Sequence, residues 1–369
     1  MSRNGADGNL RLPPYRLVRA IDAFRSLLLR IHRRIFPGNV VLYELFQHFW
    51  LLPAIKVAAE LDVAGALVER PKTAEELAAE LNVNALALSR VLRALAGHGI
   101  FRQRMDGRFL LTPTAKALLD GPGSLRHMIL HHLGKVNWDL MSSLDHSVRT
   151  GEDAFTVRYG MPTYRYLQSH PQEYALFEQS MSDLSDLGLA PIMASYDFGK
   201  FRIVADIGGG EGYLLGHILR NNPGQSGKLF DTAEALVKAH EFLRQLNVNE
   251  RITIVDGDFF KSVPGGCDLY ILKNIIHNWN DTDSVRILQA IRSAAPAESR
   301  ILVIEMVVPD GNAPSLAKLL DLQMMATMAG GCERTAGEFR ALLQKGGWNV
   351  RRIIPTVAPI SLIEAEPLR

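Results

Sequence analysis

Cysteine is scarce in this chain of 369 residues, which contains only Cys267 and Cys332. The two cysteines lie far apart and lack the close spacing of metal ligands, so the sequence predicts neither a disulfide framework nor a zinc site. Two ordinary thiols are typical of a reducing compartment. We therefore expect a cytoplasmic protein without a bound metal.

An excess of charge of either sign is also lacking. The chain has 41 Lys and Arg residues against 39 Asp and Glu residues, a net charge of +2, and no field built for nucleic acid dominates such a molecule. No apolar run approaches the roughly 20 residues that a membrane span requires, and no secretory signal opens the chain. We expect two domains, with neither a nucleic-acid nor a membrane partner.

Residues 1–38 are predicted to form a basic amphipathic arm. Arginines alternate there with Leu, Ile and Phe residues at helical spacing. Two interpretations are open, a helix that packs on a partner subunit and a helix that lies on a membrane surface. The first is favoured, and neither assigns chemistry to the arm.

Residues 39–120 are predicted to form a mostly helical, winged-helix-like domain. Thr73 followed three residues later by Glu76 is typical of a capping box at a helix start. An apolar helix over 85–96 follows, and then two strands around the turn Asp106-Gly107.

A winged helix usually reads DNA, which makes a DNA-binding regulator one alternative function. The candidate recognition helix over 85–96 offers only Arg90 and Arg93 to base edges and is otherwise apolar. Burial of this helix against a second subunit is therefore the favoured interpretation.

Residues 121–196 are predicted to be a helical connector, and residues 197–369 an α/β domain. After Phe201, apolar strand-like runs alternate with helical patterns, which is typical of a doubly wound, mainly parallel sheet. The last two strands, 348–354 and 361–365, have no helix between them and should pair antiparallel at an edge. The other strands are expected at 203–207, 228–230, 252–255, 269–272 and 301–305, and the helices at 214–220, 233–246 and 284–294.

A glycine-rich turn follows the first of these strands, which includes Asp206. Tyr213 stands where the dinucleotide fingerprint G-x-G-x-x-G needs a glycine, so Gly208, Gly210 and Gly212 follow G-x-G-x-G instead. Glycines there allow the backbone to approach a ligand closely. On its own, such a turn is as typical of a tight bend as of a binding loop.

Two acidic residues at the next strand ends favour the binding loop. Asp231 closes the second strand, about 20 residues after the glycines, where a carboxylate can accept both hydroxyls of a ribose. Asp258 follows the third strand and is placed to meet an adenine amino group, with Phe259 beside the ring. Polar anchors at three successive strand ends indicate a nucleoside site that does not require phosphates.

These segments resemble a known family. The order VADIGGGEG, FD, GDFF, LKNIIHNW, IE and GGCERT is similar to that of the small-molecule O-methyltransferases typified by plant caffeate and flavonoid enzymes and bacterial antibiotic enzymes, and the likeness runs from about residue 39 to the C-terminus. The resemblance implies a homodimer held by the winged-helix-like domain. It also implies a Rossmann-like, seven-stranded domain that binds S-adenosylmethionine and releases S-adenosylhomocysteine.

Carried over residue by residue, the resemblance implies a complete site. His277 would be the general base, with Glu305 and Glu333 as the two carboxylates that orient it. Imidazole has the intrinsic pKa suited to removing a hydroxyl proton, and a carboxylate on its far nitrogen fixes the tautomer. The expected cofactor contacts are Asp206, Gly208, Gly210, Gly212, Asp231, Asp258, Phe259 and Lys273.

The acceptor pocket is expected to hold a small hydroxylated aromatic or polycyclic secondary metabolite. Asn274 stands where plant relatives tend to have an aromatic residue, which favours a larger or more polar acceptor than a simple phenylpropanoid, such as a phenazine-like molecule. The residues predicted to line the pocket are Phe177, Met181, Asn274, Met324, Met325 and Met328.

The chain departs from the family at two places. Asn278 stands where the family usually has Asp directly after the base, and Thr232-Ala233 replaces Leu-Pro after the ribose-binding Asp. Because relatives of this fold can keep the cofactor and change the reaction, a cofactor-binding protein with different chemistry is a second alternative function.

Overall fold

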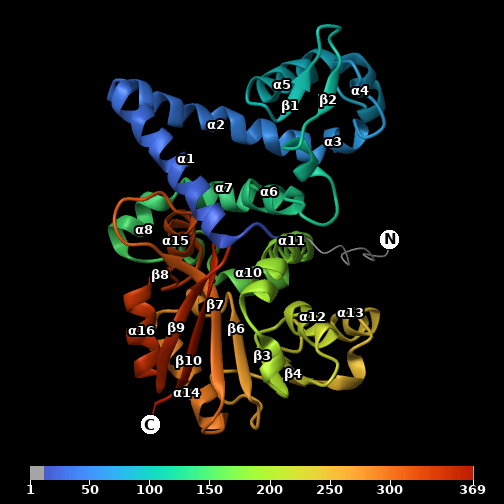
Figure 1. Ribbon diagram of the computed structural model, residues 1–369. Coiled ribbons are helices and arrows are strands. Elements are labelled where there is room, and N and C mark those ends of the chain that lie inside the picture. Colours follow the sequence, from blue (N-terminus) through green and yellow to red (C-terminus); the bar gives the residue numbers. More distant parts are fainter. Residues whose placement is uncertain (1–11, 369) are drawn as a thin grey trace. The chain divides into compact units, whose positions relative to one another are not determined.

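The computed structural model describes residues 12–368 and contains two compact units, each of which is described by itself (Figure 1). The first unit contains Asp22–Asp139 and Tyr164–Leu187. The second contains Leu140–Thr163 and the chain from Gly188 onward, together with the residues before Asp22 that open helix α1.

The first unit has the winged-helix outline that the sequence predicts. Thr73 and Glu76 form the expected capping box, and the two strands pair antiparallel with Phe101 opposite Leu111. Leu77, Leu92 and Phe101 are fully buried in its core. Its elements include α2 (Gly38–Glu60), α3 (Val63–Ala66), α4 (Ala74–Leu81), α5 (Ala85–Gly97), β1 (Phe101–Gln103), β2 (Phe109–Leu111) and α6 (Arg126–His132), with α7 (Lys135–Met141), α10 (Thr163–Ser169) and α11 (Pro171–Ser195) reaching its boundaries.

Helix α2 corrects one expectation. Its 23 residues are long and apolar enough, by length and composition, to cross a membrane, whereas the sequence was expected to hold no apolar run of that size. The run is interrupted only by Glu44 and the pair Gln47-His48 before Lys56, so the average hydropathy of the helix stays high. One such helix is weak evidence of a span, because the core helices of soluble proteins and signal sequences can have the same length and composition.

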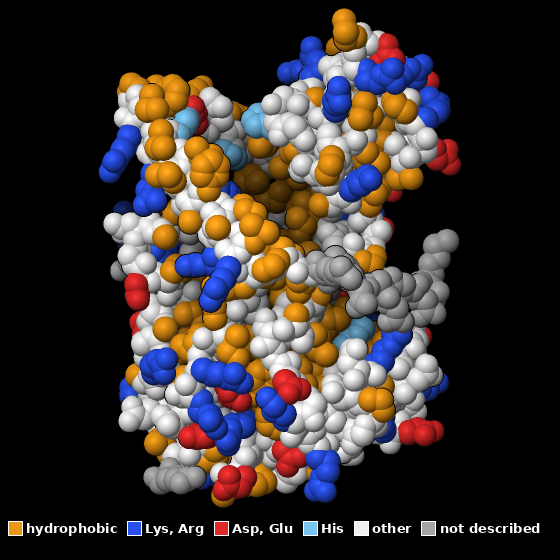
Figure 2. Space-filling view, viewed as in Figure 1, with side chains coloured by type: hydrophobic (Ala, Val, Ile, Leu, Met, Phe, Trp, Pro, Cys, Tyr) orange, Lys and Arg blue, Asp and Glu red, His pale blue; other side chains and the backbone are white. Residues whose placement is uncertain are grey.

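The predicted amphipathic arm is helical, as α1 (Tyr15–Ile35), and has no buried residue. Large apolar side chains are also exposed on α2, among them Phe46, Phe49 and Trp50. Figure 2 shows apolar side chains gathered where α1 and α2 meet. These two helices therefore present an apolar surface that the described residues of the chain leave uncovered.

The second unit contains the predicted sheet. Seven strands lie in the order β5-β4-β3-β6-β7-β10-β9, and the two-residue β8 pairs with the end of β7. The first five are parallel, and β10 joins β7 and β9 antiparallel, as expected at the edge. The strands are β3 (Ile203–Ile207), β4 (Ser226–Asp231), β5 (Ile252–Asp256), β6 (Leu269–Lys273), β7 (Arg300–Val308), β8 (Arg334–Thr335), β9 (Trp348–Pro355) and β10 (Ile360–Pro367).

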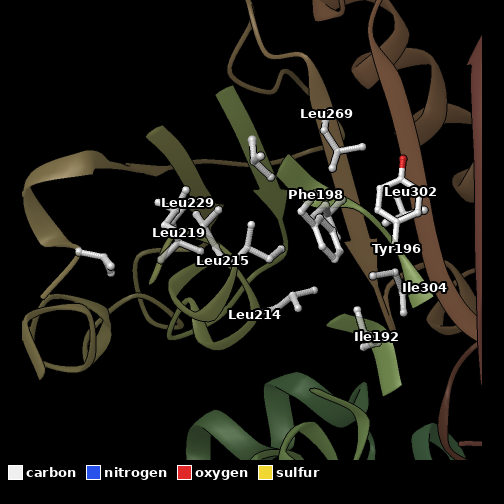
Figure 3. Packing of buried hydrophobic residues seen from close by; sticks show 14 of the residues in the cluster. Ile192, Tyr196, Phe198, Leu214, Leu215, Leu219, Leu229, Leu269, Leu302 and Ile304 are labelled. Atoms are coloured by element: carbon white, nitrogen blue, oxygen red, sulfur yellow. The ribbon is translucent and has the colours of Figure 1, made fainter. Parts of the chain in front are cut away.

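Alternating side chains of the buried strands form a core on each face of the sheet. Leu302 and Ile304 of β7 pack into one core with helices α12 and α13, whereas Ile301 and Val303 face the other core with α14 and α16. Figure 3 shows the first core, where Leu215 and Leu219 of α12 lie beside Leu229 of β4. The helices are α8 (Leu144–Thr150), α9 (Ala154–Tyr159), α12 (Tyr213–Asn221), α13 (Ala239–Gln245), α14 (Asp281–Ala294), α15 (Leu316–Thr327) and α16 (Ala336–Lys345).

Helix α13 begins later than predicted, at Ala239 instead of residue 233. The backbone N–H groups of Ala235 and Leu236 both donate to the carbonyl of Thr232, so the chain turns before the helix begins. The helical periodicity of the sequence extends through this turn because Leu236 is buried in the same core as the helix.

Candidate functional site

The residues predicted to carry the chemistry follow the carboxyl ends of five neighbouring parallel strands. The strand order places Asp258 after β5, Asp231 at the end of β4, the glycine turn after β3, His277 after β6 and Glu305 in β7. The direction of strand succession reverses between β3 and β6, and ligands of open α/β sheets bind at such a point. All of these residues belong to the second unit.

The glycine turn needs its glycines for conformation and for space. Gly208, Gly210 and Gly212 all have positive φ, at 72°, 57° and 79°, a region that side chains disfavour. A Cβ on Gly208 would lie 2.4 Å from Cδ1 of Ile275, whereas nothing lies within 4 Å of the equivalent point on Gly210. The backbone at Gly210 is therefore open to a ligand.

Asp231 is tied to this turn. Its Oδ2 accepts the backbone N–H of Gly210 at 2.9 Å, and its Oδ1 accepts that of Thr232 at 2.7 Å. Burial raises the pKa of the Asp231 carboxyl, and the two backbone donors act against that rise. A carboxylate oxygen has capacity for a further donor, so Asp231 is able to accept ribose hydroxyls while it orders the turn.

Asp258 and Phe259 stand beyond β5 as expected. Asp258 accepts the N–H of Phe260 at 2.9 Å, and its side chain is 43% exposed, so it remains accessible to a ligand. Phe259 packs edge-on against Trp279, with the ring centroids 6.0 Å apart. The ring of Phe259 also lies 4.0 Å from the point where a Cβ of Gly208 would be, which brings these two predicted cofactor contacts together.

Asp206 and Lys273 form a buried electrostatic pair beneath the turn. Burial raises the pKa of Asp206 to about 7, and Lys273 opposes that rise. Burial likewise lowers the pKa of Lys273, and Asp206 opposes that change. The side chains at this edge fit S-adenosylmethionine by type, since carboxylates suit its hydroxyl and amino groups and the open glycine backbone leaves room beside them.

His277 forms a close pair with Glu333. Its Nδ1 lies 2.7 Å from Oε1 of Glu333, and the two side chains are 13% and 0% exposed. A carboxylate can only accept, so Nδ1 carries a proton, and in the neutral ring Nε2 keeps its lone pair. Burial opposes charge on the imidazole, but the Glu333 and Glu305 carboxylates outweigh it and raise the pKa of His277 above its usual value.

Glu305 acts on the base through the backbone. Its Oε1 accepts the N–H groups of Ile275, Ile276 and His277 at 3.2, 2.6 and 3.2 Å. The sequence predicts that both carboxylates orient the base, and the hydrogen bonds of Glu305 are made to the turn (η4, Ile276–Asn278) that presents the imidazole. Of the two carboxylates, it is Glu333 that bonds to the ring.

Arg334 holds the same turn from its carbonyl side and was not predicted. Its guanidinium donates to the carbonyl oxygens of Ile276 and Trp279 at 3.1 and 2.8 Å, and it also binds Asp281. The residue is 2% exposed. Its only signal in the sequence is the position directly after Glu333, because the contacts join segments that lie more than 50 residues apart.

Asn274 and Asn278 form a second contact within this turn. Asn274 has a positive φ of 54°, and its carbonyl accepts the side-chain amide of Asn278 at 3.2 Å. Aspartate, the usual residue of the family after the base, has no donor for this bond when ionised. The departure at Asn278 therefore has a structural role in the loop that bears His277.

The residues predicted to line the acceptor pocket fall into both units. Phe177 and Met181 lie on the part of α11 that belongs to the first unit. Met324 and Met325 lie on α15 in the second unit, and Met328 follows that helix. Met324 is buried at 6% exposure, whereas Met325 and Met328 are partly exposed. Within residues 12–368, no group of His, Cys, Asp and Glu side chains is arranged to hold a metal ion.

Comparison with known proteins identifies both parts of the chain. Residues 141–349 match an O-methyltransferase domain, and residues 43–121 match an O-methyltransferase dimerisation domain. A phenazine O-methyltransferase of Lysobacter antibioticus is 36% identical over 90% of this chain and 97% of its own length. The O-demethylpuromycin-O-methyltransferase of Streptomyces alboniger is 38% identical over 85% of each chain.

A nitrogen-methylating relative and a solved structure complete the comparison. The 8-amino-8-demethylriboflavin N,N-dimethyltransferase of Streptomyces davaonensis is 33% identical over 90% of this chain and 94% of its own length. The methyltransferase of calicheamicin biosynthesis, solved with S-adenosylhomocysteine, is 36% identical with a TM-score of 0.81, over 89% of this chain and 98% of that one. The chain thus belongs to the family of S-adenosylmethionine-dependent O-methyltransferases with a dimerisation domain, and it is a methyltransferase of small secondary metabolites.

Proposed function

We propose that this enzyme methylates a hydroxyl oxygen of a small aromatic or polycyclic secondary metabolite, with His277 as the general base. The buried His277–Glu333 pair carries the proposal. It engages Nδ1, so the lone pair of Nε2 in the neutral ring can accept a hydroxyl proton. S-adenosylmethionine supplies an electrophilic methyl group. The tasks of the protein are then to align the acceptor oxygen and to accept its proton.

In this proposal the other residues hold the reactants in place. Glu333 stabilises the imidazolium that forms, and Glu305 fixes the backbone of the turn that presents the ring. Asp231, Asp258 and Phe259 bind the nucleoside, while Asp206 and Lys273 support the glycine turn. Asn274, Met324, Met325 and Met328 of the second unit contact the acceptor. Base catalysis by His277 accounts for about 10²–10⁴-fold of the rate.

Methyl transfer to nitrogen is a second candidate, favoured by the similarity to the riboflavin-type N,N-dimethyltransferase. A neutral aromatic amine already presents a lone pair and needs no base before it attacks. Purified enzyme should be incubated with S-adenosylmethionine and with matched pairs of phenols and anilines, each pair built on the same ring system. Mass spectrometry then measures the masses of the products. A gain of one methyl on the phenols supports the proposal, and a gain confined to the anilines contradicts it.

A homodimer is also part of the proposal. The dimerisation domain spans residues 43–121 and includes most of α2. Five large apolar side chains of α2 are more than half exposed, namely Leu42, Leu45, Phe46, Phe49 and Trp50. A group of large exposed apolar side chains on one helix is typical of a protein–protein interaction surface. A second copy of the chain, paired through the same surface, would bury it in an isologous interface.

A further inference from the structure

The side chain of Glu333, the partner of His277, makes few hydrogen bonds of its own. Its Oε1 bonds to the imidazole, and its Oε2 is buried without a hydrogen-bond partner among the described residues. The carboxylate therefore has no second hydrogen bond that fixes its direction toward the ring. The geometry of the pair depends on what holds the main chain at residue 333.

Asp321 of α15 holds that main chain. Its Oδ1 accepts the backbone N–H of Glu333 at 2.8 Å, across 12 positions of sequence. One residue earlier, the N–H of Cys332 donates to the carbonyl oxygen of His277 at 2.9 Å. One residue later, Arg334 begins β8, which pairs with β7. Of these three attachments of the main chain, the one at Glu333 is made by a side chain, so a substitution is able to remove it.

The helix that carries Asp321 also carries predicted acceptor contacts. Met324 and Met325 follow Asp321 by three and four positions, and residues at these spacings lie on the same face of a helix. Because Asp321 reaches Glu333, this face of α15 is turned toward the segment that bears the partner of the base. All of these residues belong to the second unit, as does His277.

We propose that Asp321 is a positioning residue, which fixes Glu333 and, through it, His277 relative to the face of α15 that carries the acceptor contacts. This inference rests on the proposed function, in which His277 is the base. Without the carboxylate of Asp321, the N–H of Glu333 loses its acceptor, and the segment between α15 and β8 has one attachment fewer. A small displacement of a catalytic group is enough to lower a rate by as much as about a hundredfold.

Removal of the accepting oxygen should lower kcat on any acceptor that the enzyme methylates. Asp321→Ala and Asp321→Leu both lack the oxygen and should lose about ten- to a hundredfold in kcat. Asp321→Asn keeps an oxygen that is able to accept the N–H and should remain within about threefold of the wild-type rate. Asp310→Ala is the matched control, because it removes the same charge from an exposed residue that precedes α15. Calorimetry should find S-adenosylhomocysteine affinity within about twofold of wild type in every variant.

The pKa of His277 provides a second measurement, which needs no methyl transfer. The carboxylates of Glu333 and Glu305 raise this pKa, and burial opposes them. An NMR titration of histidine-labelled enzyme bound to S-adenosylhomocysteine measures it, with the His277 signal assigned from its absence in His277→Gln. Asp321→Ala should lower the pKa by about 0.5 or more, because Glu333 is then displaced from the ring. Asp321→Asn should stay nearer the wild-type value.

A double-mutant cycle shows whether Asp321 acts through Glu333. In a Glu333→Ala background no carboxylate is left to orient, so the further change Asp321→Ala should cost about threefold or less in kcat. A general weakening of α15 would instead cost the same in both backgrounds, and thermal denaturation would detect it.

The outcomes distinguish this inference from the proposed function. An unchanged kcat or an unchanged pKa of His277 in Asp321→Ala overturns the role of Asp321. Equal losses in the two backgrounds, or an Asp321→Asn variant as impaired as Asp321→Ala, also overturn it. A fall in the pKa of His277 that is confined to the variants without the oxygen supports it, even if no phenol gains a methyl group. Failure to methylate any phenol counts only against oxygen methylation.

Discussion

The Nδ1 atom of His277 lies 2.7 Å from Oε1 of Glu333, and the glutamate side chain is completely buried. The histidine follows β6, and the glutamate lies 56 positions later, just before β8. Glu305 and Arg334 bond to the backbone of the turn that bears His277 and so hold the histidine beside Glu333. The arrangement is the one that a histidine base requires, with one nitrogen engaged and the other available.

Replacing His277 by Ala should lower turnover by about 10²–10⁴-fold, because the general base that accepts the hydroxyl proton is then missing. Cofactor affinity should stay nearly unchanged, since the cofactor anchors are other residues. The loss should be smaller for phenols that are already ionised at the assay pH. Steady-state kinetics on a series of phenols of graded acidity measures this trend. A near wild-type rate on an un-ionised phenol would show that alignment alone suffices.

Glu333→Gln should shift the pH profile of kcat. The carboxylate raises the pKa of His277, and the reactive form of the base is the neutral one. Activity should therefore rise with pH through the raised pKa of His277 in the wild-type enzyme. The uncharged amide removes the contribution of Glu333 to the raised pKa, so the ascending limb should move to lower pH. The plateau should fall, by less than in His277→Ala. An unchanged limb would remove Glu333 from this role.

Asp231→Ala should weaken S-adenosylhomocysteine binding about tenfold or more, because a hydrogen bond to a charged group contributes roughly 1.5 to 3 kcal/mol. The loss includes the support that Asp231 gives to the N–H of Gly210. Asp256→Ala is the matched control, since Asp256 pairs with Asp231 in the sheet register and is exposed. Calorimetry that finds both variants equal to wild type would reject the ribose assignment.

Arg334→Lys should lower kcat by about ten- to a hundredfold. One ammonium group is unable to bridge the carbonyls of Ile276 and Trp279. The turn that bears His277 should therefore shift, and a small displacement of the base lowers the rate of proton removal. The KM for the cofactor should change little. Arg340→Lys, an exposed site on α16, serves as the control. A parallel loss of kcat and of cofactor binding would indicate general unfolding, which thermal denaturation would detect.

Phe46→Glu should convert the enzyme to a monomer at micromolar concentration, because it places a charge in the exposed apolar face of α2. Val237→Glu provides the control, since Val237 is equally apolar, 75% exposed and outside the dimerisation domain. Light scattering measures the mass of both variants. A wild-type protein that is already monomeric would contradict the dimer.

The elements of the sheet were predictable because each rests on a local pattern. Strand β3 was expected at the residues where it is found, and the glycine turn after it was expected from its composition. The start of α13 was not, because a buried Leu236 continues the helical period through a turn. The membrane-length run in α2 was missed because its few polar residues do not lower the average hydropathy of the helix enough.

The sequence by itself determined which residue types stand at the carboxyl ends of the parallel strands, and hence the nucleoside anchors and the histidine. These residues could be assigned to one site because the carboxyl ends of parallel strands lie along the same edge of the sheet. Only the tertiary structure decided what each buried polar group does. It assigned Glu305 to the backbone of the turn, gave Arg334 a task with no local signature, and joined Asp321 to the backbone of Glu333. Hydrogen bonds between segments distant in the chain depend on packing in three dimensions, and no periodicity in the sequence records them.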